Sequence, residues 1–171
     1  MIVADTGAIV ALIDRGDRHH RALKRAFDEA PERWILPWAI LPEVDYLVAE
    51  HVGRRARDAF MADLRDGAFN VAWGDDDILA EAAALHASHA TLGLGLVDAA
   101  VIVTSIRARA SAIATLDLKH FAAIRIPGGP KLLPRDLSAT DATDATDNTD
   151  HTDHTDRTDR TDKARLRRWR R

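Results

Sequence analysis

The chain begins with Met1-Ile2-Val3-Ala4-Asp5-Thr6-Gly7, a short apolar run that ends in a carboxylate, a hydroxyl and a glycine. A second apolar run, Ala8–Ile13, follows directly. This order is typical of a buried strand that breaks into a turn and then enters a helix. Asp5 should therefore lie at the end of the strand, which in an open α/β sheet is the edge that binds ligands.

Strand and helix candidates alternate through the rest of the body. Strands are expected at 34–36, 69–73, 112–116 and 124–127 or 131–133, and helices at 19–30, 40–52, 54–65, 78–90 and 96–110. Strands separated by helices predict a parallel sheet with helices on both faces. The sequence therefore indicates an α/β fold.

Composition excludes several classes of protein. The 171 residues favour one domain, and the absence of cysteine excludes disulfides, thiolate zinc sites and cysteine nucleophiles. The first strand leaves no room for a cleavable signal, and the most apolar segment, 94–106, is too short to span a bilayer. We therefore expect a cytoplasmic protein with no membrane attachment.

The character of the chain changes after Leu137. Thr-Asp recurs eight times at period three from Thr140, and the chain then closes on basic residues around Trp169. Without large apolar residues the repeat should be disordered, which divides the chain into a body (1–137) and a tail (138–171). Basic residues beside a tryptophan could bind RNA, but repeat expansion followed by an incidental basic terminus is the better explanation, because nothing else in the tail supports a function.

Four acidic residues stand where packing alone does not call for a charge. Asp5 and Asp117 each follow an apolar strand. Glu43 lies beside the apolar face of a helix start, and Asp98 interrupts a helix start that is otherwise apolar. Burial costs roughly 2–7 kcal/mol even for an unpaired neutral polar group, and clustered carboxylates also repel one another.

A divalent cation would offset both costs. Because the candidate ligands are all oxygen atoms, Mg²⁺ is favoured over zinc, with Mn²⁺ as the other possibility. Each acid also has a purely structural explanation: Asp5, Asp98 or Asp117 could cap a helix, and Glu43 could pair with a surface arginine. The structural explanation is the better one for any single acid, whereas the set of four favours a metal site.

Four motifs resemble, in order and spacing, those of PIN-domain ribonucleases, in particular the VapC-type toxins of bacterial toxin–antitoxin pairs. They are IVADTG at 2–7, LPEVDYL at 41–47, LVDAAV at 96–101 and ATLDLKHF at 114–121. The resemblance covers the body to about Leu133 and none of the tail. It implies a three-layer α/β/α sandwich around a central parallel sheet.

The resemblance also implies a function. It makes Asp5, Glu43, Asp98 and Asp117 the metal ligands and catalytic acids of a Mg²⁺-dependent endoribonuclease, with Thr6 and Thr115 as polar support. Metal-activated water would then hydrolyse RNA phosphodiester bonds, leaving a 5′-phosphate and a 3′-hydroxyl. The implied partners are RNA, a cognate antitoxin protein and a second copy of the chain in a homodimer.

Two alternatives stay open on the sequence. A non-catalytic RNA-binding or assembly module could keep the PIN fold, although an intact set of four acids argues against a decayed site. A small phosphatase could use Asp5 as its nucleophile, but that chemistry usually needs a second aspartate two residues later, where Gly7 stands.

Overall fold

The computed structural model describes residues 1–137, and the tail at 138–171, expected to be disordered, lies outside the described residues. Within the described part, five short strands form one parallel sheet in the order β3-β2-β1-β4-β5. They are β1 (Ile2–Ala4), β2 (Trp34–Pro37), β3 (Asn70–Ala72), β4 (Ala112–Ala114) and β5 (Lys131–Leu133). The predicted parallel sheet is confirmed, with the opening strand at its centre.

The opening strand is central because all of its residues are apolar. Its Ile2 pairs with Trp34 on β2 and with Ala112 on β4, and Val3 and Ala4 are fully buried. This burial is typical of a strand that is covered on both faces. The backbone N–H of Asp5 continues the pairing to the carbonyl of Ala114 at 2.8 Å. Asp5 therefore lies at the carboxyl edge of the sheet.

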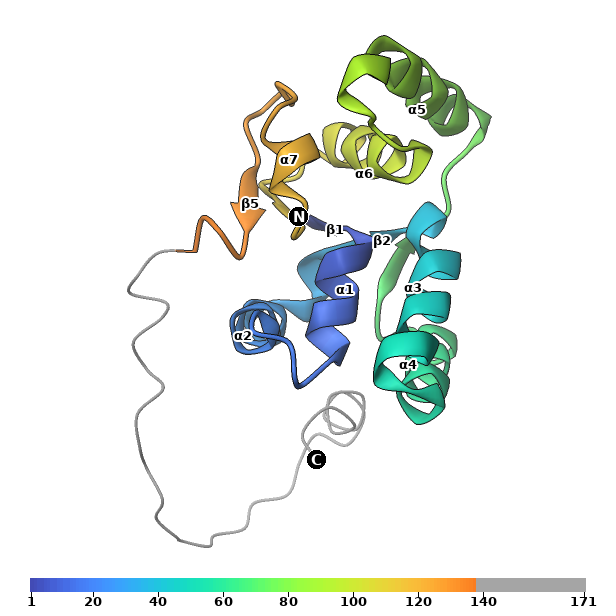
Figure 1. Ribbon diagram of the computed structural model, residues 1–171, viewed down its shortest axis with the longest axis vertical. Coiled ribbons are helices and arrows are strands. Elements are labelled where there is room, and N and C mark those ends of the chain that lie inside the picture. The colour runs from blue at the N-terminus through green and yellow to red at the C-terminus, as the bar shows by residue number, and fades with distance from the viewer. Residues whose placement is uncertain (138–171) are drawn as a thin grey trace, which may run out of the picture.

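Helices cover both faces of the sheet, with α5 and α6 on one side and α1 to α4 on the other (Figure 1). The helices are α1 (Thr6–Ile13), α2 (His20–Glu29), α3 (Leu41–Leu47), α4 (Arg54–Arg65), α5 (Asp76–Ser88), α6 (Leu96–Arg107) and α7 (Leu118–Phe121). The architecture is the expected three-layer α/β/α sandwich.

The most apolar helix lies against the sheet. Residues 99–105 of α6 are all buried, and the helix packs on β1 and β2 while α5 covers its outer side. A helix that is apolar on nearly every side is expected to be buried in this way. This position brings the start of α6, with Asp98 in its first turn, to the sheet.

Several boundaries differ from the expected ones. The helix expected at 40–52 divides into a 3-10 turn η2 (Trp38–Ile40), α3 and a π-helical turn η3 (Val48–Val52). Pro42 is tolerated because it lies in the first turn, where the backbone N–H has no partner within the helix. The strand considered at 124–127 does not form, because the Gly129 N–H closes a turn on the Ile126 carbonyl at 3.1 Å.

The short helix α7 was not expected from the sequence pattern. Its four residues are too few to show helical periodicity, and they begin directly after Asp117. Among the described residues, none of the helices has both the length and the apolar character that crossing a membrane requires.

Candidate functional site

Asp5 is held at the carboxyl edge of the sheet by the turn from β1 into α1. It is the N-cap of α1, where its Oδ1 accepts the Thr6 N–H at 2.7 Å. Its Oδ2 accepts the Thr115 hydroxyl at 2.9 Å. With 6% of its surface exposed, Asp5 is a buried carboxylate whose cap and threonine contacts fix both oxygen atoms.

Thr6 and Thr115 link the acids to one another. The Thr6 hydroxyl donates to Oε2 of Glu43 at 2.7 Å, which joins the start of α1 to the first turn of α3. The Thr115 hydroxyl, besides donating to Asp5, accepts the backbone N–H of Asp117 at 3.0 Å. Each threonine therefore connects two of the acidic positions.

Asp98 and Asp117 lie at the starts of two further helices. In the first turn of α6, Oδ2 of Asp98 accepts the Gly95 N–H at 3.2 Å. At the N-cap of α7, Oδ1 of Asp117 accepts the His120 N–H at 3.1 Å. The capping explanation is thus correct for one oxygen each of Asp5, Asp98 and Asp117, but capping does not require the three carboxylates to face one another.

The structure adds His120 to the acids. Its Nδ1 lies 2.8 Å from Oδ2 of Asp117 and 3.1 Å from Oδ2 of Asp98. Among the described residues, Asp98, Asp117 and His120 each offer one ligand atom, all within 4.8 Å of one another. His120 is not among the site residues expected from the sequence, and the signal that could have found it is its spacing of three from Asp117 at a helix start.

The acids interact electrostatically. Burial raises the pKa of Asp5 to about 6, the hydrogen bonds from Thr115 and Thr6 oppose this rise, and the charges of Asp98 and Glu43 add to it. Burial also raises the pKa of Asp98, against the Gly95 hydrogen bond and the charge of His120, while Asp117 and Glu43 raise it further. The four carboxylates therefore share one electrostatic environment, in which Asp98 interacts with each of the other three.

This environment fits a divalent cation. Positive charge would offset both the burial of Asp5 and Asp98 and the mutual repulsion of the carboxylates. The Nδ1 atom of His120 is buried and has no hydrogen-bond partner among the described residues, so it is a further polar atom that a cation would satisfy. The atoms near Asp98 that could bind a cation include this nitrogen, which the expectation of oxygen ligands alone leaves out.

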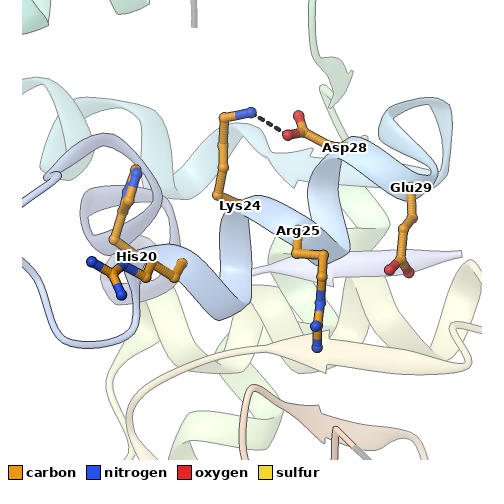
Figure 2. Close-up of a pocket in the computed structure, with 6 residues that line it drawn as sticks. His20, Lys24, Arg25, Asp28 and Glu29 are labelled. Atoms are coloured by element: carbon orange, nitrogen blue, oxygen red, sulfur yellow. Dashed lines mark hydrogen bonds and ion pairs between the residues drawn. The ribbon is translucent and has the colours of Figure 1, made fainter. Parts of the chain in front are cut away.

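A surface hollow on α2 is separate from these acids. It is lined by His20, Arg21, Lys24, Arg25, Asp28 and Glu29, all from one helix, and Figure 2 shows Lys24 paired with Asp28. The His20 ring contacts the Ala11 carbonyl at 3.3 Å, in the second half of α1, whereas Asp5 precedes the first turn of that helix. None of the predicted site residues therefore lines this hollow.

Comparisons with known proteins identify relatives of the whole body. A family model described as the PIN domain matches residues 2–126. Ribonuclease VapC26 of Mycobacterium tuberculosis is 32% identical over 128 residues, which make up 75% of this chain and 95% of that protein.

Solved structures share the fold. VapC20 of Mycobacterium tuberculosis, described as a toxin that cleaves the sarcin-ricin loop, has a TM-score of 0.61 at 23% identity, covering 66% of this chain and 87% of its own. DNA-bound VapBC from Salmonella typhimurium has a TM-score of 0.57 at 19% identity, covering 77% of this chain and 95% of its own. At these identities the likeness supports the architecture rather than the chemistry.

Proposed function

The chain belongs to the PIN domain family, and from this premise we propose that it is a metal-dependent endoribonuclease acting as the toxin of a toxin–antitoxin pair. The observation that carries the proposal is the convergence of Asp5, Glu43, Asp98 and Asp117, which come from four different elements and influence one another electrostatically. A relative named as a ribonuclease, aligned over 95% of its length, supports RNA as the substrate.

The four acids would hold Mg²⁺ or Mn²⁺. When bound, the cation would supply the charge that neutralises a phosphate oxygen and lowers the pKa of water for hydrolysis of the phosphodiester. Thr6 would keep the Glu43 carboxylate in place, and Thr115 would do the same for Asp5. Without a cation, the same carboxylates would repel the phosphate backbone of RNA.

The exposure of the acids indicates the side from which RNA approaches. The side chain of Asp117 is 38% exposed and that of Asp98 is 20% exposed, whereas Asp5 is buried. A phosphodiester would therefore meet Asp117 before Asp5. Asp5, with Thr6 and Thr115 around it, would form the inner wall that positions the other groups.

An antitoxin partner and a homodimer belong to the same proposal. Structural neighbours include complexes described as VapBC, one from Salmonella typhimurium and one from Rickettsia felis, both with DNA. By analogy we propose that this chain binds a cognate antitoxin protein. Co-purification of the chain with the product of a neighbouring gene would support this partner, and expression of the chain alone without slower growth would count against the toxin role.

The nuclease proposal is tested by mapping RNA 5′-ends after brief expression of wild type, Asp5→Asn, Asp98→Asn and Asp58→Asn. Asp58 is an exposed acid on α4 that pairs with Arg57, so Asp58→Asn is a control for the loss of one negative charge. We expect new 5′-ends with wild type and Asp58→Asn and none with the two site variants, whose folding is checked by circular dichroism.

Two outcomes would contradict the proposal. Full cleavage by either folded site variant would refute the assignment of its acid. Metal binding by wild type without any cleavage would favour the non-catalytic RNA-binding or assembly module.

A further inference from the structure

We propose that His120 is a nitrogen ligand of the cation, bound through Nδ1 beside Asp98 and Asp117, and that it shifts the preference of the site from Mg²⁺ toward first-row transition ions such as Mn²⁺. The inference rests on the proposed function only in requiring a divalent cation at this edge of the sheet. It assigns the histidine a role that the four-acid motif does not include.

The spacing of the three ligand atoms fits coordination of one ion. Ligand atoms that each lie about 2.1 Å from an ion, at right angles to each other, are about 3 Å apart. The Nδ1 atom of His120 is 2.8 Å from Oδ2 of Asp117 and 3.1 Å from Oδ2 of Asp98. Both distances are those expected of neighbouring ligands.

The alternative is that His120 only positions the carboxylates through hydrogen bonds. Both carboxylate oxygens are close enough for that role, but the buried Nδ1 has no hydrogen-bond partner among the described residues, so neither contact has the direction of a hydrogen bond. A nitrogen in this position has a lone pair available for a cation if its proton is carried by Nε2.

The backbone of α7 holds the histidine where this role requires it. Asp117 caps the helix by accepting the backbone N–H of His120, so the same turn fixes the Asp117 carboxylate and the origin of the His120 side chain. Residues three apart on a helix lie on the same face. Asp98 reaches the pair from the start of α6, where the Gly95 N–H holds its carboxylate.

The nature of the ligand determines the preference for the ion. Mg²⁺ takes oxygen ligands and retains several waters, whereas imidazole nitrogen suits first-row transition ions. Carboxylates alone would leave Mg²⁺ and Mn²⁺ close in affinity, and one imidazole favours Mn²⁺. His120 is therefore the residue expected to set the ratio of the two affinities.

The direct test is electron spin-echo envelope modulation of Mn²⁺ bound to the full chain, purified without a histidine tag. We expect a ¹⁴N coupling of the size that a directly coordinated imidazole gives, and we expect His120→Gln to remove it. His89→Gln is the matched control, because His89 is a partly buried histidine whose Nδ1 contacts the Leu85 carbonyl of α5 and which is not grouped with Asp98 and Asp117. That variant should keep the coupling.

Affinity provides a second readout. Calorimetric titration should show the Kd for Mn²⁺ rising by at least about 10- to 100-fold in His120→Gln, because loss of a direct ligand should weaken binding no less than loss of the outer groups that orient ligands. The Kd for Mg²⁺ should change less. The ratio of the Kd for Mg²⁺ to the Kd for Mn²⁺ should therefore fall toward one. His89→Gln should leave both constants unchanged.

The outcomes separate this inference from the proposed nuclease activity. Bound Mn²⁺ without nitrogen coupling in wild type, or coupling that persists in His120→Gln, would overturn the role of His120 even if the chain cleaves RNA. Nitrogen coupling that depends on His120 would support the inference even if no RNA is cut. A wild-type chain that binds Mg²⁺ but no Mn²⁺ would overturn the inference alone, and a chain that binds neither ion would overturn both.

Discussion

Asp5 is a buried carboxylate whose burial makes its charge unfavourable. Its oxygens accept two hydrogen bonds, from Thr6 and Thr115, yet burial still dominates and raises its pKa to about 6. A charged residue in such a position lowers the free energy of unfolding unless a positive charge compensates it. A loss of stability of this kind is expected where a residue serves function rather than packing. The cost can be measured in the metal-free protein.

Replacing Asp5 with asparagine should stabilise the metal-free protein near neutral pH. The pKa of Asp5 rises from 3.8 to about 6 on folding, so the folded state binds the proton more tightly. Stability is therefore greatest below the unfolded pKa, falls as pH rises toward the folded pKa, and stays reduced above it. A pKa difference of about 2 corresponds to at most about 3 kcal/mol, and asparagine keeps the oxygen that caps α1.

Urea unfolding in EDTA at pH 4 and pH 7.5 measures this effect. The free energy of unfolding of Asp5→Asn should equal that of wild type at the lower pH and exceed it at the higher. Asp58→Asn should show no such pH-dependent difference. If the free energy of unfolding of Asp5→Asn is lower than that of wild type by the same amount at both pH values, Asp5 is not destabilising when charged.

Thr115 holds Asp5 and Asp117 in position by hydrogen bonds. Thr115→Val should therefore reduce both the affinity for Mn²⁺ and the free energy of unfolding. Valine keeps the shape but loses the hydroxyl that donates to Asp5 and accepts the Asp117 N–H. We expect about 1 kcal/mol less free energy of unfolding and about 10- to 100-fold weaker Mn²⁺ binding. Thr104→Val, at a buried threonine of α6, controls for the substitution itself and should leave Mn²⁺ affinity unchanged.

At the scale of elements, the chain uses acids at helix starts for two different purposes. Asp75 caps α5 by accepting the Ile78 N–H at 2.8 Å and pairs with Arg107, in agreement with the structural explanation of acids before a helix. Asp98 and Asp117 also accept N–H groups at helix starts, but their carboxylates face each other and His120. Helix capping alone therefore does not separate structural acids from site acids.

Asp75→Ala should lower stability without changing metal binding. The substitution removes the cap of α5 and one partner of Arg107, which keeps its second partner Glu81 at 2.9 Å. Thermal unfolding should show a lower midpoint than wild type, while the Kd for Mn²⁺ is unchanged. A weaker metal affinity would mean that the electrostatic environment of the site extends to α5.

At the scale of the whole molecule, parallel topology brings together acids that are distant in sequence. Because all five strands run the same way, β1 and β4 end at the same edge, and Asp5 and Asp117 follow those ends directly. The Asp5 N–H and the Thr115 hydroxyl join the two ends by hydrogen bonds. Asp98 and Glu43 reach the same edge from the first turns of α6 and α3.

Because every predicted site residue lies within 1–137, a chain shortened to that range should cut RNA at the same positions as the full chain. Removal of 138–171 takes away eight aspartates and eight Lys or Arg residues, so the formal net charge stays at −3. Mapping RNA 5′-ends for both chains at two salt concentrations tests this. A loss of cleavage by the shortened chain that retains its circular dichroism spectrum would assign RNA binding to the basic terminus.

The sequence by itself determined the alternation of strands and helices and the parallel sheet, and it singled out four acids that the structure places near one another, because each rests on local signals. Apolar runs ended by Asp5 and Asp117, and an apolar helix interrupted by Asp98, are visible without coordinates. Boundaries were less accurate where tertiary packing overrides local preference, as in the π-helical turn after α3 and the short α7.

Only the tertiary structure decided which groups meet and how they ionise. The contact of His120 with Asp98 joins α7 to α6, and no periodicity predicts it because it depends on how two helices pack at the end of the sheet. The pKa of Asp5 likewise depends on burial among segments that are distant in the chain. Local patterns can place a carboxylate at the end of a strand, whereas its desolvation and neighbours come from the whole fold.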